Sequence, residues 1–174
     1  MFSVPFWEFD GVADMLKTLK TLHKQVFFVT NNSRIARSEI IEKFHRLGLR
    51  HVEEHSILSC GVAAAFYLQQ SVHLGTKHIN ISPESDNDAI VKTKKKVFLI
   101  GTDSMGHELE KAGIEYVGGQ SFNDKKVDPQ KSTLPDIDQD ICAVVAGYDP
   151  NLNYYKINYA QLLINKFGCE FIAC

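Results

Sequence analysis

The feature that most constrains the fold is a regular alternation of two sequence patterns along most of the chain. Short apolar runs typical of buried strands cover residues 25–29, 56–58, 96–100, 142–146 and 170–173. Apolar side chains recur at helical spacing over residues 12–22, 33–47, 61–70, 105–112 and 154–165. Because neighbouring parallel strands need a crossover connection, this alternation predicts an α/β fold with a mostly parallel, doubly wound sheet.

Several helix ends can also be predicted from residue type. Asp10 precedes the first helical pattern and is expected to cap it through its carboxylate. Gly48 and Gly113 follow the second and fourth helical patterns, where glycine commonly ends a helix.

Two polar segments interrupt the alternation, at residues 71–95 and 119–140, and both are expected to be exposed loops. The first contains a lysine run, for which solvation is favoured over a partner patch. The second contains spaced acids, which lack the glycine turn and downstream glutamate of a cation loop. These charged residues are Lys92, Lys94, Lys95, Lys96, Asp136, Asp138 and Asp140.

Composition argues against several classes of protein. A formal net charge of −2 gives no electrostatic basis for binding nucleic acid or an acidic membrane surface. No apolar run approaches the roughly 20 residues that a membrane-spanning helix requires. The first residues lack the features of a signal peptide, and the four cysteines have no metal-ligand spacing. We therefore expect a cytoplasmic protein whose cysteines are reduced thiols that behave as small buried hydrophobic residues.

The strongest candidate for a binding site is the segment Thr-Asn-Asn-Ser at residues 30–33, within "FFVTNNSRIAR". It follows a predicted strand, at the sheet edge where α/β proteins bind ligands. The Thr30 hydroxyl can donate to a phosphoryl oxygen. The backbone N–H groups of Asn31 and Asn32 are expected just before a helix, whose first turn favours an anion. Helix capping by Asn32 or Ser33 is the alternative interpretation, but one residue suffices for a cap.

This segment carries a resemblance to a known family. The stretch "VFFVTNNSRIARSEIIEKFHRLGL" resembles the second motif of the haloacid dehalogenase superfamily, and most closely its 4-nitrophenylphosphatase branch. That branch includes phosphoglycolate (glycerol-3-phosphate) and pyridoxal phosphatases. Three later stretches are similar to the branch in the same order: "SCGVAAAFYLQQ", "VFLIGTDSMGHELEKAGIEYVGG" and "AVVAGYDPNLNYYKINYAQLLINKFGCEFIAC".

The resemblance implies a Mg²⁺-dependent phosphomonoesterase that acts on small phosphorylated metabolites. It implies that Thr30 donates to the phosphoryl oxygens, that Asn31 lines the site through its backbone, and that Asn32 orients the catalytic loop. It also implies a haloacid dehalogenase-like core over residues 1–100, followed over residues 101–174 by a linker and the start of an inserted α/β cap. Members of the family often form dimers through the cap, so a homo- or hetero-dimer is expected.

The sequence departs from the family at the position of the nucleophile. The family pattern is Asp-x-Asp-Gly, whereas this chain has Glu8 and Asp10 before Gly11. A second alignment places Gly11 at the start of the first helix and leaves no aspartate pair. This alignment is favoured because helical spacing begins directly at Val12, which leaves no room for the family's flap. Glu8 and Asp10 are therefore weak catalytic candidates. The family's lysine and metal-binding motif have no recognisable counterpart in this sequence.

Two other segments imitate catalytic motifs, because a glycine and an aspartate follow a predicted strand in each. They are Gly101-Thr102-Asp103 and Gly147-Tyr148-Asp149, and both match non-catalytic positions of the family. A generic nucleotide-binding fold is disfavoured, since no G-x-G-x-x-G follows any strand. We expect a phosphatase homologue, incomplete at both ends, whose activity is impaired or absent. The alternative is a non-catalytic relative that binds phosphate or dimerises.

Overall fold

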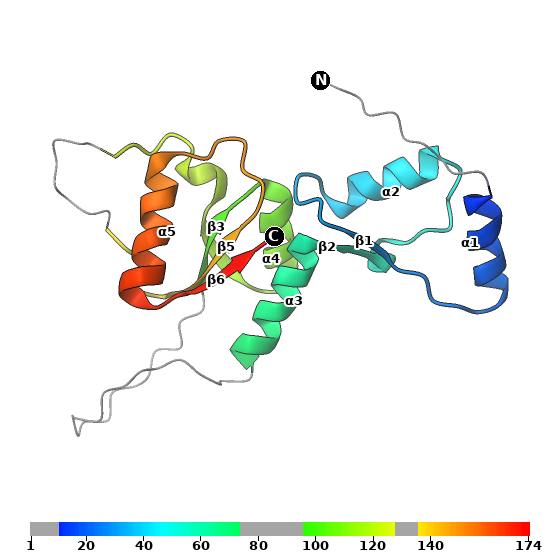
Figure 1. Ribbon diagram of the computed structural model, residues 1–174, viewed down its shortest axis with the longest axis horizontal. Helices are drawn as coiled ribbons and strands as arrows, with labels where there is room; N and C mark the ends of the chain where they lie inside the picture. Colours follow the sequence, from blue (N-terminus) through cyan, green and yellow to red (C-terminus); the bar gives the residue numbers. More distant parts are fainter. Residues whose placement is uncertain (1–10, 74–95, 128–135) are drawn as a thin grey trace.

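The computed structural model describes residues 11–73, 96–127 and 136–174 (Figure 1). Helices and strands alternate along the chain as the sequence predicts. In chain order the elements are α1 (Val12–Thr21), β1 (Phe28–Thr30), α2 (Arg37–Arg46), a short 3₁₀ turn (Glu54–Ser56), β2 (Ile57–Ser59), α3 (Cys60–His73), β3 (Lys96–Ile100), α4 (Asp103–Lys111), β4 (Glu115–Gly118), a second 3₁₀ turn (Gly119–Phe122), β5 (Ile141–Ala146), α5 (Tyr154–Phe167) and β6 (Glu170–Ala173).

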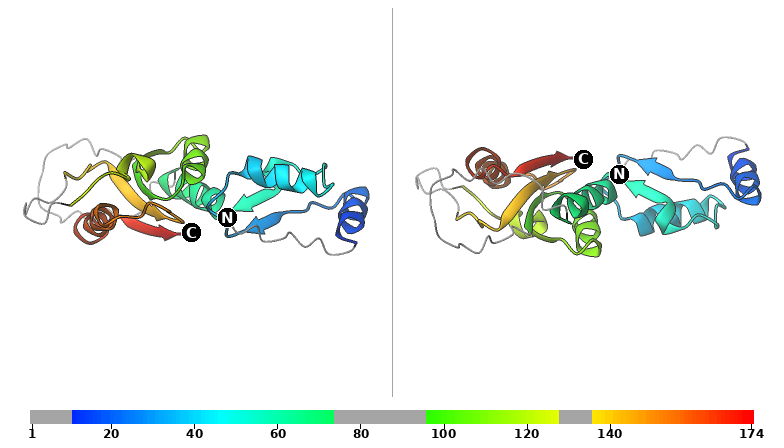
Figure 2. Two further views of the ribbon diagram at one scale, coloured as in Figure 1. Left: turned by 90° about the horizontal axis from the view of Figure 1, so that it is seen from above. Right: turned by 90° about the horizontal axis from the view of Figure 1, so that it is seen from below.

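These strands form two separate parallel sheets, which lie on either side of α3 (Figures 1 and 2). In the smaller sheet β1 pairs with β2, and Thr30 lies opposite Ser59 at the carboxyl ends of both strands. The larger sheet has the strand order β4-β3-β5-β6, with every pair parallel. The expected α/β class with parallel pairing is confirmed, but the strands form two sheets where one was predicted.

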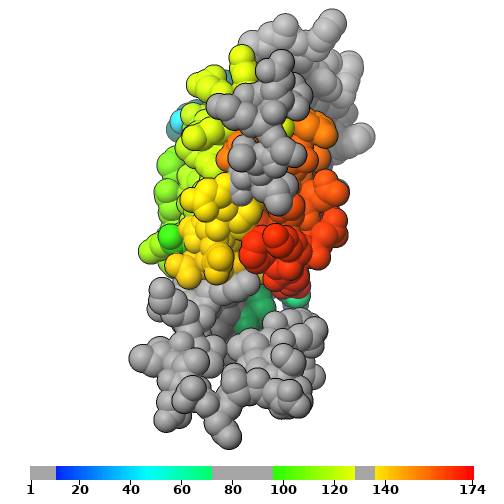
Figure 3. Space-filling model, turned by 90° about the vertical axis from the view of Figure 1, so that its left-hand side faces the viewer, coloured from blue at the N-terminus to red at the C-terminus, as the bar shows by residue number. Residues whose placement is uncertain are grey.

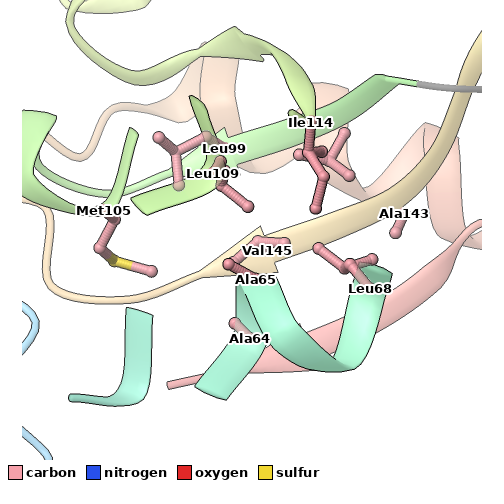
Figure 4. Packing of buried hydrophobic residues seen from close by; sticks show 10 residues of the cluster. Ala64, Ala65, Leu68, Leu99, Met105, Leu109, Ile114, Ala143 and Val145 are labelled. Atoms are coloured by element: carbon pink, nitrogen blue, oxygen red, sulfur yellow. The ribbon is translucent and has the colours of Figure 1, made fainter. Parts of the chain in front are cut away.

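The larger sheet is covered by helices on both faces. Alternate side chains of each strand point to opposite faces, so each strand contributes residues to both layers of the core. On one face, Leu99 and Val145 pack against α3 and α4 (Figure 4). On the other face, Phe98 and Val144 pack against α5, whose Tyr159 ring centroid lies 4.6 Å from that of Phe98. Helix α5 and the chain entering β5 form the surface at this end of the molecule (Figure 3). The sheet is therefore doubly wound.

Helix α3 joins the two halves of the structure. Its first residue, Cys60, follows directly after the last residue of β2. Further along the helix, Ala65 and Leu68 are buried against Met105 and Leu109 of α4 (Figure 4). The chain thus passes from the smaller sheet to the core of the larger one without an intervening loop.

The smaller sheet has a core of its own beneath α1 and α2. Leu16, Leu49, Val52 and Ile57 are buried in it, and the ring centroids of Phe28 and Phe44 lie 4.7 Å apart. The opposite face is open, since Val29 of β1 is 76% exposed. Helix α1 is as predicted, but its N-cap is Gly11, with φ 84°, where Asp10 was expected. Asp10 lies outside the described residues.

Several other predicted boundaries moved. β1 ends at Thr30 where residue 29 was expected, and α2 begins at Arg37 where residue 33 was expected. Gly48 and Gly113 follow α2 and α4 in the left-handed conformation, with φ 84° and 73°, which confirms their role in ending these helices. Strand β4 was missed, because its four residues Glu-Tyr-Val-Gly are too short and too polar to give a clear strand pattern.

Much of the two polar segments lies outside the described residues, which exclude 74–95 and 128–135. Within the described part, Lys96 and Asp138 form an ion pair at 3.2 Å. Asp138 also accepts a hydrogen bond from the backbone N–H of Asp140, at 2.9 Å. In the described ranges, no three acidic, histidine or cysteine side chains are placed to share a metal ion. Nor is any helix of these ranges long and apolar enough to cross a membrane.

All four cysteines are described, and none forms a disulfide. Cys169 is buried, as expected, but Cys174 is exposed. The prediction that all four behave as small core residues was therefore wrong for Cys174, which follows the last strand and lies beside the start of α3.

Candidate functional site

The carboxyl end of β1 places Thr30 at the edge of the smaller sheet. Its Oγ1 accepts a hydrogen bond from the backbone N–H of Asn32 at 3.2 Å. Because a hydroxyl can both accept and donate, the proton of Thr30 stays available for another acceptor. The arrangement fixes the hydroxyl oxygen while leaving its donor capacity for a ligand.

Asn32 forms a local turn of its own. Its side-chain Oδ1 accepts a hydrogen bond from the backbone N–H of Arg34 at 2.8 Å. Asparagine side chains that bond to the backbone two residues ahead compete with helix formation. This turn explains why the helix starts late, and it also shows that Asn32 caps no helix here.

The start of α2 is separated from Thr30–Ser33. The helix has its N-cap at Ala36, whose backbone N–H donates to the Glu39 carboxylate at 3.3 Å. The expectation that the N–H groups of Asn31 and Asn32 lie directly before a helix was therefore wrong. The N–H of Asn32 is bonded to Thr30, and a carboxylate already lies at the first turn of the helix.

Ser33 connects this segment to the larger sheet. Its side chain is buried, at 7% exposure. The Oγ of Ser33 accepts from the backbone N–H of Tyr148 at 3.0 Å, and its carbonyl oxygen accepts from the hydroxyl of Thr102 at 2.8 Å. The Ser104 hydroxyl donates to the same carbonyl at 3.2 Å. These partners lie just beyond the carboxyl ends of β3 and β5, so both sheets meet at Ser33.

Two arginines near the start of α2 have different surroundings. Arg37 forms a bidentate ion pair with the buried Glu108 of α4, with nitrogen–oxygen distances of 2.9 and 2.7 Å. Arg34 is exposed, and its guanidinium lies 4.6 Å from the centroid of the Tyr148 ring. The first arginine holds the two sheets together, and the second stacks on the loop that follows β5.

The aspartates of the two Gly-x-Asp segments are occupied by neighbouring side chains. Asp103 accepts a hydrogen bond from the side-chain amide of Gln120. Asp149 forms an ion pair at 2.7 Å with Lys156, and both side chains are almost completely buried, at 3% and 0% exposure. Lys156 Nζ also donates to Asn123 Oδ1 at 2.7 Å. In this arrangement Asp149 anchors the loop after β5 to α5.

Two cysteine thiols lie close to the backbone of Asn31. Cys60 Sγ donates to the carbonyl of Asn31 at 3.5 Å, and Cys174 Sγ donates to the carbonyl of Cys60 at 3.5 Å. Although Cys174 as a whole residue is exposed, its thiol is partly shielded from solvent against Cys60, and this desolvation together with the Cys60 thiol raises the pKa of Cys174 to about 12. Cys174 is therefore protonated at neutral pH.

A cavity of about 440 Å³ runs along β1 toward α2 and includes Thr30 and Asn32 in its wall. The rest of the wall is mostly apolar, with Phe28, Ile35 and Phe44 among its residues. Its polar side chains are those of Thr30, Asn32 and Lys43.

The other predicted catalytic candidates, Glu8 and Asp10, lie outside the described residues. Sequence reasoning missed the roles of Thr102, Tyr148 and Glu108, which support the Thr30 segment from the larger sheet. The sequence feature that indicates these contacts is the pair of glycines, Gly101 and Gly147, directly after β3 and β5. A Cβ on Gly147 would lie 3.2 Å from Ser33 Oγ, so this glycine allows the loop to approach Ser33 closely.

Comparison with known proteins agrees with this architecture. Residues 8–115 match the model of the haloacid dehalogenase-like hydrolase family. Phosphoglycolate phosphatase 2 of Arabidopsis thaliana is 36% identical over 165 residues, covering 94% of this chain and 49% of the relative. The 4-nitrophenylphosphatase of Schizosaccharomyces pombe is 26% identical over 171 residues, covering 93% of this chain and 49% of the relative.

A solved structure shows the same relationship. The p-nitrophenyl phosphatase from Archaeoglobus fulgidus is 25% identical, with a TM-score of 0.61 over 92% of this chain and 46% of that protein. The chain spans about half the length of the curated relatives that it matches. The resemblance seen in the sequence is confirmed, and the chain belongs to the haloacid dehalogenase-like hydrolase family.

Proposed function

We propose that this chain provides the phosphate-binding segment of a phosphomonoester hydrolase that acts on small phosphorylated metabolites. The observation that carries the proposal is the geometry of Thr30, whose hydroxyl oxygen is fixed by the Asn32 N–H at the carboxyl end of β1. Membership of a hydrolase family whose matched relatives are named phosphatases supports the proposal.

In this proposal, the Thr30 hydroxyl donates to a phosphoryl oxygen, because its proton is not used by Asn32. Asn31 lines the site through its backbone, and Asn32 keeps the turn closed through its bond to Arg34. Phosphoryl transfer depends chiefly on positioning and charge stabilisation, and a fixed donor contributes to both. In the same proposal, residues 1–100 are assigned to the core and residues 101–174 to a linker and part of a cap, while β3, at the end of the first range, belongs to the sheet formed by the second.

Mg²⁺ is the proposed cofactor, on the basis of the family resemblance. When bound, it would neutralise charge on the phosphoryl group. The described residues do not fit a magnesium site, because they include no cluster of three candidate ligands. We therefore assign no part of the reaction to these residues through the metal.

We further propose that turnover by this chain is weak or absent. In the favoured alignment the chain has no counterpart of the family's aspartate pair, and in the other alignment Glu8 stands where the family places its nucleophilic aspartate. The additional methylene would move the attacking oxygen by about an ångström, and a displacement of that size can cost on the order of 10²-fold in rate. The second candidate function is a non-catalytic relative that binds phosphate, or that dimerises along an edge strand such as β4. The hydrogen bonds of Thr30 and Asn32 favour retained binding without requiring a nucleophile.

Two measurements test the proposal. Inorganic phosphate binding is followed by ³¹P NMR, and 4-nitrophenyl phosphate hydrolysis is measured with and without Mg²⁺. We expect phosphate binding that Thr30→Val abolishes and that Thr18→Val, a change at an exposed helix hydroxyl, leaves intact. Phosphate binding equal in wild type and Thr30→Val would refute the binding role. Rapid Mg²⁺-dependent hydrolysis that is lost in Thr30→Val would refute the proposed impairment.

A further inference from the structure

Ser33 makes hydrogen bonds that the binding role proposed for Thr30–Asn32 does not explain. Ser33 follows the Thr30–Asn32 segment directly, yet its hydrogen-bond partners all come from the larger sheet. Figure 1 shows the chain between β1 and α2 facing the end of α4 and the loop after β5. The segment is thus held at Thr30 by its own sheet and at Ser33 by the other one.

The two kinds of contact at Ser33 are chemically distinct. The side-chain Oγ accepts from a backbone N–H, that of Tyr148. The main-chain carbonyl lies 2.8 Å from the Thr102 hydroxyl and 3.2 Å from the Ser104 hydroxyl, and these hydroxyls lie 2.7 Å apart, so their two protons serve two of these three contacts at a time. Both the backbone path and the side chain of Ser33 are therefore fixed, and the position is nearly inaccessible to water.

The partners of Ser33 are themselves rigidly held. Gly147 leaves room for Ser33 Oγ, and its N–H donates to the Ile100 carbonyl at 2.8 Å. Tyr148 precedes Asp149, which is anchored by the buried Lys156. Thr102 is the N-cap residue of α4 and lies directly before its first turn. A small shift of either loop would move Ser33, and Ser33 is covalently joined to Asn32.

We propose that Ser33 is a positioning residue, through which the loops after β3 and β5 hold Thr30–Asn32 in its phosphate-binding geometry. This inference rests on the proposed phosphate-binding function. Ser33 itself makes no contact with phosphate in this proposal. It acts through the turn in which the Asn32 N–H bonds to Thr30 and the Asn32 side chain bonds to Arg34.

The test compares phosphate affinity with backbone geometry in the same variants of the full chain. Ser33→Ala removes the acceptor for the Tyr148 N–H and leaves the carbonyl contacts intact. Thr102→Val removes one of the two donors to that carbonyl, whereas Thr102→Ser retains the hydroxyl. Ser38→Ala, at an exposed position in the first turn of α2, is the matched control.

We expect Ser33→Ala to weaken inorganic phosphate binding by about five- to tenfold, because the free energy of the lost Tyr148–Ser33 hydrogen bond no longer holds the Thr30–Asn32 turn in its binding geometry. Thr102→Val should have a smaller effect because Ser104 still donates, and Thr102→Ser should restore wild-type affinity. The backbone amide signals of Asn31 and Asn32 should move in ¹H–¹⁵N spectra of Ser33→Ala and Thr102→Val without phosphate. They should not move in Ser38→Ala.

A purely structural role would lower the free energy of unfolding but leave the phosphate affinity of the folded protein unchanged. That result, with wild type binding phosphate through Thr30, would overturn the inference and leave the proposed function standing. If wild type itself binds no phosphate, the proposed function fails, and the positioning role of Ser33 fails with it.

Discussion

Arg37 of α2 and Glu108 of α4 meet side by side, with Arg37 Nε 2.9 Å from Glu108 Oε1 and Arg37 Nη2 2.7 Å from Glu108 Oε2. The first residue belongs to the half of the structure that contains Thr30, and the second packs on the larger sheet. Glu108 is buried, at 7% exposure, and the Arg37 side chain is 17% exposed. This ion pair is a principal polar link between the halves.

Removal of the arginine should therefore destabilise the protein. Arg37→Met leaves a buried carboxylate without its main partner, and such changes typically cost about 3 kcal/mol in the free energy of unfolding. The double variant Arg37→Met/Glu108→Leu should recover most of that loss. Urea denaturation measures both. The control is Lys111→Met, which removes a largely exposed pair with Glu54 and should cost less than about 1 kcal/mol. Equal losses in Arg37→Met and Lys111→Met would contradict the prediction.

The buried Lys156–Asp149 pair should show a similar asymmetry. Lys156→Met leaves the almost completely buried Asp149 carboxylate without its ion-pair partner, so unfolding should become easier by about 3 kcal/mol or more. Asp149→Asn together with Lys156→Met removes both charges and should cost less than the single change. Thermal unfolding at neutral pH compares the variants, with Lys166→Met, near the end of α5, as a control. An additive double variant would argue against the charge imbalance as the cause.

Two glycines with positive φ should respond differently to alanine. Gly113 has φ 73° and open space where a Cβ would be, so Gly113→Ala should cost only about 1 kcal/mol for the left-handed backbone. At Gly118, φ is 103°, and a Cβ would lie 2.5 Å from the Leu99 carbonyl oxygen and 2.8 Å from the Phe98 ring. Gly118→Ala should therefore cost clearly more, on the order of 3 kcal/mol. Matching midpoints in urea would refute the predicted difference.

The thiol of Cys174 should react slowly with alkylating agents at moderate pH. Burial, with the neighbouring Cys60, raises its pKa to about 12, and only the thiolate is nucleophilic. Iodoacetamide labelling at pH 8, followed by mass spectrometry, should be at least about tenfold slower in the folded protein than in denaturant. Cys60→Ser should shift the labelling profile toward lower pH, since it removes one cause of the raised pKa. An unchanged profile would show that Cys60 has no influence.

The raised pKa of Cys174 also makes the free energy of unfolding depend on pH. Because the folded pKa lies above the unfolded value, the folded protein binds more protons at alkaline pH, and its stability should fall as pH rises from about 9 toward 12. Cys174→Ala should reduce this slope in urea titrations made between those pH values. Cys169→Ala provides the comparison, since it removes a buried thiol at the other end of the last strand.

The sequence was informative about strands made of a short apolar run. β3, with four buried residues in a row, was predicted with its observed boundaries, and so was β6, although three of its four residues are exposed. It was less informative where local hydrogen bonds compete with the helix, as at Asn32, which delayed α2 to Arg37. The contacts of Ser33 with Thr102 and Tyr148 join residues that are distant in sequence, and neither spacing nor residue type could predict them.

Strand β2 and helix α3 follow each other directly, and this connection determines how a movement of the larger sheet reaches Thr30. Ser59 ends the strand, Cys60 begins the helix, and Ser59 lies opposite Thr30 in the smaller sheet. No loop separates these residues, while Ala64, Ala65 and Leu68 of α3 pack against one face of the larger sheet. Any rotation of the larger sheet that carries α3 with it must bend or displace the strand end next to Thr30. In mechanical terms, α3 is a lever arm whose short end lies one strand away from the Thr30 hydroxyl.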